Sequence, residues 1–191
     1  MITVVSGLPR SGTSLVMQML QAGGHPILCD EHRPADTDNP RGYLEYAKVR
    51  TLERDATWLS EAEGRAVKVV SPLLARLPTG FDYRVIFVRR DLHEVLQSQE
   101  QMLQRLNQPI GLDSATMLQH FERHLKTIDT LLTKRQDMQM LDIQHAHLIR
   151  ETLPSAYRIA EFLERKLDVS RMVGVVDLGL HRQRNSTTGS Q

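Results

Sequence analysis

Gly7-Leu8-Pro9-Arg10-Ser11-Gly12-Thr13-Ser14 is the stretch of sequence on which the fold depends. It follows a short β-branched run at residues 2–5 and leads into a helical pattern at 13–22, so it joins a strand to a helix. Its glycines allow a turn tight enough for several backbone N–H groups to point at one place, and the helix start adds further free donors. The hydroxyls of Thr13 and Ser14 and the forked cation of Arg10 suit the same purpose. The stretch therefore predicts a binding site for a phosphate-like anion.

The two glycines have the G-x4-G spacing of the phosphate loop in P-loop nucleotide-binding proteins. In ATPases and GTPases, a lysine follows the second glycine and contacts the β- and γ-phosphates, and the next hydroxyl holds Mg²⁺. Thr13 stands in place of that lysine, and the cation lies inside the loop as Arg10. A glycine turn without a ligand is the competing interpretation, and the cation and two hydroxyls count against it.

Outward from this loop, strand-like runs alternate with helical patterns. Three β-branched runs, at 2–5, 66–70 and 84–88, are nearly all apolar, which is typical of parallel strands buried on both faces. A fourth strand is predicted at 138–143, and helices at 13–22, from Asp91, at 114–135 and from Pro154. This alternation predicts an α/β fold of three layers, like that of the P-loop NTPases, with a central parallel sheet flanked by helices. We expect one domain over residues 1–184 and a flexible polar tail at 185–191.

The composition argues against several classes of function. The chain of 191 residues has 24 Lys and Arg against 23 Asp and Glu, a net charge of +1, and 5% aromatic residues. Neither a nucleic-acid surface nor a broad field for anionic membranes is expected, so an anion site must be local. No apolar run approaches the ~20 residues that span a bilayer. The single cysteine, Cys29, forms no intrachain disulfide, which favours a reducing compartment. We expect a cytoplasmic protein without a membrane span.

With a loop that reads PRSGT, the chain resembles the sulfotransferases that use PAPS (3′-phosphoadenosine 5′-phosphosulfate), particularly their small bacterial members. The resemblance implies that the loop holds the 5′-phosphosulfate and that Arg10 stabilises the bridging oxygen as the sulfuryl group leaves. Ser11, Gly12, Thr13 and Ser14 match the remaining loop positions. PAPS would be the donor and PAP its product, and no metal would be required.

A second pattern of the same family supports the resemblance. Its members place an arginine after a central strand and a serine eight residues later, and both contact the 3′-phosphate. Here the strand at 85–88 is followed by Arg89 and Arg90, and Ser98 lies eight residues beyond Arg90. A guanidinium at a strand end and a hydroxyl in the next helix can converge on one phosphate. We favour Arg90 over Arg89 for this contact.

Two further contacts follow from the resemblance alone. Family members often carry an aromatic residue near the adenine after a later strand, and this chain has His145 there. The resemblance implies that the imidazole takes the place of that aromatic ring. It also implies that Arg182 and Arg184, in the basic segment near the C-terminus, close over the 3′-phosphate, although a solvated basic tail is an equal alternative.

The general base is the least determined part of the predicted site. Many family members carry a histidine in a Lys-x-His context after the third strand, but here Val70 follows Lys68 at that spacing. Lys68 can still contact the transferring sulfate or the phosphates. Other branches use a carboxylate from the loop after the first helix, and residues 38–45 resemble their NP-x-GY-x-E stretch. Glu45 is our first candidate for the base and Asp38 the second.

Histidines one helical turn apart, His120 and His124, have a spacing compatible with a metal site, but no third ligand stands near them in the sequence. We therefore expect exposed helix residues there and no metal site.

The predicted activity is transfer of a sulfuryl group from PAPS to a hydroxyl or amine of an unknown acceptor, which could be a small molecule, a carbohydrate or a lipid. Residues 30–60 are expected to supply much of the acceptor pocket, and a second copy of the chain in a homodimer could complete it. Two alternatives stay open: a non-catalytic nucleotide-binding sensor that has kept the donor site, and a P-loop nucleotide kinase.

Overall fold

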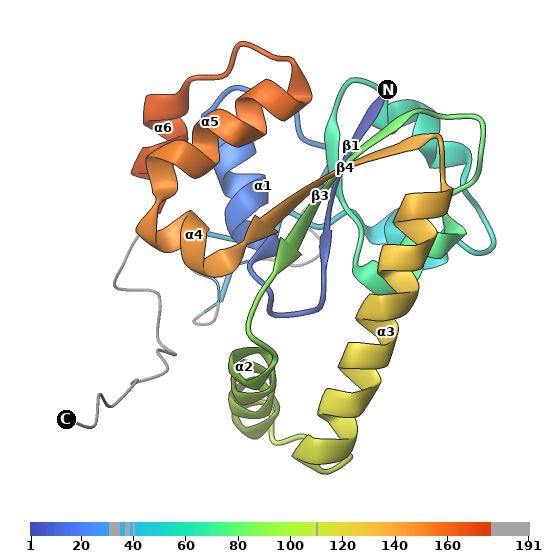
Figure 1. Cartoon of the computed structure of the whole chain (residues 1–191), viewed down its shortest axis with the longest axis vertical. Coiled ribbons are helices and arrows are strands. Elements are labelled where there is room, and N and C mark those ends of the chain that lie inside the picture. The colour runs from blue at the N-terminus through green and yellow to red at the C-terminus, as the bar shows by residue number, and fades with distance from the viewer. Residues whose placement is uncertain (31–34, 37–38, 40, 110, 177–191) are drawn as a thin grey trace.

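A parallel sheet of four strands, in the order β2-β1-β3-β4, forms the centre of the described part of the molecule (Figure 1). The computed structural model describes residues 1–30, 35–36, 39, 41–109 and 111–176. The strands are β1 (Ile2–Gly7), β2 (Ala66–Lys68), β3 (Tyr83–Arg89) and β4 (Met138–Gln144). The predicted α/β fold with a central parallel sheet is confirmed.

Helices cover both faces of this sheet (Figure 1). The α-helices are α1 (Thr13–Ala22), α2 (Leu92–Arg105), α3 (Ser114–Lys134), α4 (His145–Arg150), α5 (Thr152–Leu163) and α6 (Val169–Gly174). Three short 3₁₀ helices, η1 (Ala47–Thr51), η2 (Thr57–Ala62) and η3 (Ser71–Arg76), complete the elements of the residues described.

The core has two halves because successive side chains of a strand point to opposite faces of the sheet. Val5 and Ile86 face one half, where they join the buried residues of α1, α5 and α6. Val4 and Val85 face the other half, which contains Trp58 and the buried side of α3. Every residue of β1 is buried. This burial explains why the central strands are nearly all apolar and show no alternation in the sequence.

Several predicted boundaries need correction. β2 ends at Lys68 rather than at Val70, and α5 begins at Thr152 rather than at Pro154. Proline is tolerated in the first turn of a helix because the backbone N–H groups there have no partner within the helix. Asp91 is the predicted N-cap of α2, and its carboxylate accepts a hydrogen bond from the Glu94 N–H.

The order of the strands positions the anion loop. β1 lies between β2 and β3, and all three strands are parallel, so their carboxyl ends share one edge of the sheet. The loop after β1 therefore has the end of β2 on one side and the end of β3 on the other. Ligands of open α/β sheets bind at such an edge, where the chain continues in opposite directions from neighbouring strands. Among the described residues, no helix is both long and apolar enough to cross a membrane.

A buried histidine lies toward the other edge of the sheet. His25 follows α1, is 3% exposed and has its Nε2 atom 3.2 Å from Thr3 Oγ1. Burial, together with repulsion from Arg165, lowers the pKa of His25 to about 4. The imidazole is therefore neutral in the folded protein at neutral pH.

This lowered pKa makes the stability depend on pH. In the unfolded chain His25 takes up a proton as the pH falls through about 6.5, whereas the folded protein does not until about 4. We expect the free energy of unfolding to fall by about 3 kcal/mol from this residue between pH 7 and pH 4. Urea unfolding of the wild type and of His25→Gln at several pH values measures the difference, since all other titrating groups are shared. Parallel pH profiles for the two proteins would contradict the assignment.

Candidate functional site

A cavity of about 430 Å³ opens at the carboxyl edge of the sheet, around the anion loop. Its lining comes from the loop, the 39–50 segment, the chain after β2, the end of β3 and α2. Most of the described residues that the sequence predicts for the site line this cavity: Arg10, Gly12, Thr13, Ser14, Glu45, Lys68, Arg90 and Ser98. Residues from separate parts of the sequence are thus brought to one place.

The loop backbone has the tight turn that its glycines predict. Arg10 and Gly12 have positive φ angles, 69° and 103°, and Gly12 is the N-cap of α1. The ring of His145 packs directly against Gly12, where an added Cβ would lie 2.5 Å from the ring atom Cδ2. Only glycine fits this contact, and the start of α1 faces the cavity as a result.

Two guanidinium groups and a hydroxyl meet on the β3 side of the loop. Arg10 Nε donates to Ser98 Oγ at 2.9 Å, and Arg90 Nη1 donates to the Arg10 carbonyl oxygen at 3.1 Å. Arg90 is held by Glu94, whose Oε2 accepts from Nε at 2.9 Å. Ser98 is 3% exposed. This arrangement suits an anion with several oxygens, such as a phosphate.

Arg89, the alternative to Arg90, points elsewhere. Its Nε donates to Asp142 Oδ1 at 2.5 Å, and its Nη2 donates to Asp129. These ion pairs connect β3 to β4 and α3, so Arg89 has a structural role and does not line the cavity.

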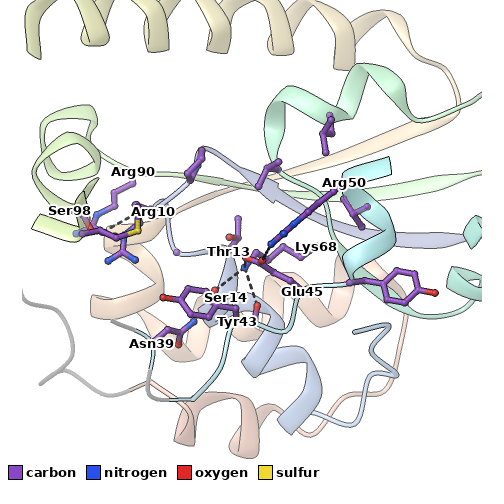
Figure 2. Close-up of a pocket in the computed structure, with 17 residues that line it drawn as sticks. Arg10, Thr13, Ser14, Asn39, Tyr43, Glu45, Arg50, Lys68, Arg90 and Ser98 are labelled. Atoms are coloured by element: carbon purple, nitrogen blue, oxygen red, sulfur yellow. Dashed lines mark hydrogen bonds and ion pairs between the residues drawn. The ribbon is translucent and has the colours of Figure 1, made fainter. Parts of the chain in front are cut away.

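A buried lysine organises the β2 side of the loop. The side chain of Lys68 is 6% exposed. Its Nζ lies 3.1 Å from Ser14 Oγ, 3.0 Å from the Tyr43 carbonyl oxygen and 3.0 Å from Glu45 Oε1 (Figure 2). The second oxygen of Glu45, Oε2, lies 3.8 Å from Arg50 Nη2. Glu45 is therefore a carboxylate at the cavity, with one oxygen toward a buried cation.

Among the described residues before Glu45, Asn39 and Gly42 are hydrogen-bonded to α1. Gln18 Nε2 donates to the Gly42 carbonyl oxygen at 2.9 Å and to Asn39 Oδ1 at 3.1 Å. The Tyr43 hydroxyl donates to the Asp36 carboxylate at 2.9 Å. Gly42, with φ at 83°, provides the turn that precedes Tyr43. These contacts direct Tyr43 and Glu45 toward the loop.

Other predicted residues lie outside the cavity lining. Ser11 is 1% exposed, and its hydroxyl points into the protein, where it has no hydrogen-bond partner among the described residues. His145 is buried under Gly12 and does not line the cavity. Asp38, Arg182, Arg184 and the predicted tail at 185–191 lie outside the described residues.

Some residues of the site and its surroundings escaped the sequence analysis. Arg50 lines the cavity, and nothing in its local sequence marks it; Asn39 lines it too and belongs to the 38–45 stretch, where it was not singled out as a site residue. His124, expected to be exposed, is half-buried, and its Nε2 lies 2.9 Å from the buried Ser71 Oγ; burial lowers the pKa of His124. His120 is exposed as expected. In the part of the chain that the structure describes, no group of three or more His, Cys, Asp or Glu residues is placed to hold a metal.

The described lining of the cavity is strongly cationic although the whole chain is nearly neutral. It has four cations, Arg10, Arg50, Lys68 and Arg90, and one carboxylate, Glu45. In a partly enclosed site such charges interact more strongly than they would in water. The site therefore has the electrostatics to bind a ligand with several negative charges.

The chain is similar to known sulfotransferases. A family model described as the sulfotransferase domain matches residues 2–180. The fold is similar to that of the sulfotransferase domain from the curacin biosynthetic pathway, at 12% identity over 92% of this chain and 77% of that chain, with a TM-score of 0.56. It is similar also to the sulfotransferase domain from the Synechococcus PCC 7002 olefin synthase, at 17% identity, 96% and 82% coverage and a TM-score of 0.56.

A third similar structure is that of mouse sulfotransferase SULT7A1 complexed with PAP, at 17% identity and a TM-score of 0.52. The match covers 91% of this chain and 61% of the mouse chain, so this chain spans less than two thirds of that enzyme. The sequence has no significant match among curated proteins. Since the family model spans residues 2–180 and the fold agrees, the chain belongs to the sulfotransferase domain family.

Proposed function

We propose that the protein transfers a sulfuryl group from PAPS to a hydroxyl or amine of an acceptor. The main support for this proposal is that the loop lies in one cavity between a set of phosphate-binding groups and a set that includes a carboxylate and a lysine. On the β3 side are Arg90 and Ser98, and on the β2 side are Lys68 and Glu45. The first set suits a bound phosphate, and the second suits proton and charge transfer.

The donor would lie across the loop. Its 5′-phosphosulfate would accept from backbone N–H groups at the start of α1 and from the hydroxyls of Thr13 and Ser14. Its 3′-phosphate would take the place beside Arg90 and Ser98. The PAP complex of the similar mouse sulfotransferase supports a donor of this kind.

The sulfuryl group would be transferred on the β2 side of the loop, beside Glu45 and Lys68. The acceptor oxygen or nitrogen would attack sulfur and form a new bond while the bond from sulfur to the bridging oxygen breaks. Glu45 would take the proton of the acceptor, and the bridging oxygen would keep the electron pair of the broken bond. Lys68 and Arg10 would stabilise that oxygen, and the proposal includes no metal. Because the Arg10 guanidinium points to Ser98, its side chain must rotate to reach the bridging oxygen.

The donor site predicts a specific pattern of PAP affinity. Arg90→Ala and Arg10→Asn should each weaken PAP binding by roughly ten- to hundredfold, since each removes charge-assisted hydrogen bonds to phosphate. Asparagine is chosen at position 10 because it tolerates the left-handed backbone there. Calorimetric titration with PAP, and separately with ATP and Mg²⁺, measures the effect. Arg54→Gln, at an exposed arginine outside the cavity lining, is the control. Binding of ATP with Mg²⁺ in preference to PAP would refute the donor assignment and favour a kinase.

With Glu45 as the base, a change at this residue should lower turnover without lowering the affinity for PAP. Glu45→Gln keeps the size of the side chain and removes its basicity, so turnover should fall by about 10²- to 10⁴-fold with PAP affinity unchanged. Release of PAP from PAPS in the presence of phenol, sugar and amine acceptors is the measurement. Glu53→Gln, an exposed glutamate paired with Arg76, is the matched control. Full turnover by Glu45→Gln would place the base elsewhere. Tight PAP binding without turnover on any acceptor would favour the sensor.

A further inference from the structure

The cavity has a second end that the donor groups leave unoccupied. In Figure 2, Arg10, Arg90 and Ser98 gather on one side of the loop, and Glu45, Lys68 and Arg50 lie on the other. The second side is formed by η1 and by the chain that follows β2. In the proposed reaction, the acceptor must approach from this side because Glu45 is the group that takes its proton.

Part of this end is apolar. Val49, on η1, and Val70 and Leu73, after β2, line the cavity there. Val49 is 6% exposed and belongs to the core, and Leu73 packs against the same core. Since these side chains are held by the packing of the core, they form a fixed wall against which an apolar body can bind.

Arg50 places a cation at the same end. Its side chain is 61% exposed and lines the cavity, and its Nη2 lies 3.8 Å from Glu45 Oε2. That separation is longer than a hydrogen bond, whereas Lys68 Nζ approaches the other oxygen of Glu45 to 3.0 Å. The carboxylate charge is thus already balanced by the buried lysine, and the guanidinium of Arg50 has donors directed at the cavity without a tight partner in Glu45.

We propose that Arg50 binds an anionic group of the acceptor, so that the substrate is an anion with an apolar body and a hydroxyl or amine near its charge. This inference rests on the proposed function because it concerns the second substrate of the same site. A planar, forked guanidinium suits a carboxylate, phosphate or sulfate oxygen pair. Because Arg50 lies beside Glu45, the anionic group and the reacting hydroxyl or amine would be held close to each other.

The test compares acceptors that differ only in charge. The probes are 2-hydroxyoctanoate and 2-hydroxyphenylacetate, in which the hydroxyl lies near the carboxylate, each against its primary amide, which has nearly the same shape without the charge. Each probe is titrated calorimetrically into the protein with and without saturating PAP, so binding is measured without turnover. The proteins are the wild type, Arg50→Gln, Arg50→Lys and the control Arg54→Gln, which removes an exposed arginine outside the cavity lining.

The wild type should bind at least one carboxylate roughly ten- to hundredfold more tightly than its amide, as expected for a charge-assisted contact. Arg50→Gln should abolish this preference, Arg50→Lys should keep part of it, and Arg54→Gln should keep all of it. PAP affinity should be the same in all four proteins.

Two results would overturn the proposal. One is failure of the wild type to prefer either carboxylate. The other is an equal loss of carboxylate and amide binding in Arg50→Gln, which would mean that Arg50 only positions Glu45. Failure of the wild type to bind PAP would instead refute the donor assignment. The titrations without PAP would still measure the role of Arg50.

Discussion

The site depends on the close packing of the loop backbone, at its two glycines, against the Val88 carbonyl oxygen and the His145 ring. A Cβ on Gly7 would lie 2.6 Å from the Val88 carbonyl oxygen, and one on Gly12 would lie 2.5 Å from the His145 ring. The loop is therefore fixed against the ends of β3 and β4 at once. In this position the start of α1 lies between Lys68, at the end of β2, and Arg90, directly after β3. The contact that orders the loop also decides which groups an anion on the loop will meet.

Lys68 makes the second half of the site depend on the first. It is a buried cation, and a buried charge is tolerated when it is paired and hydrogen-bonded. Its partners come from the loop, through Ser14, and from the 43–45 segment, through the Tyr43 carbonyl and Glu45. A movement of that segment would leave the ammonium without part of its compensation. The position of Glu45 is thus coupled to the loop that would hold the donor.

Much of this arrangement could be predicted because its signals are local. The strand, loop and helix at the N-terminus follow from a buried β-branched run and a glycine pattern, and Asp91 caps α2 by the ordinary geometry of an N-cap. The short 3₁₀ helices give no periodic signal because each has fewer than two α-helical turns of sequence.

The remaining features depend on tertiary contacts that no local pattern records. Ser11 turns inward while its neighbours face the cavity, and His145 packs beneath Gly12. Arg50 reaches the cavity only because η1 lies beside the end of β2 in space. The spacing to Ser98 favours Arg90 over the adjacent Arg89, but only the tertiary structure shows that Arg89 pairs with Asp142 and Asp129 and so connects β3 to its neighbours.

Trp58, on η2, is an intrinsic fluorescent probe. Trp58 is the single tryptophan of the chain, and its ring meets that of Tyr46 edge-on with centroids 5.5 Å apart. Tyr46 lines the cavity at its η1 end, whereas Trp58 itself is 1% exposed. Tryptophan emission in this protein therefore comes from one buried place, one side chain removed from the acceptor end. A change in emission on adding a ligand would report a rearrangement of that wall.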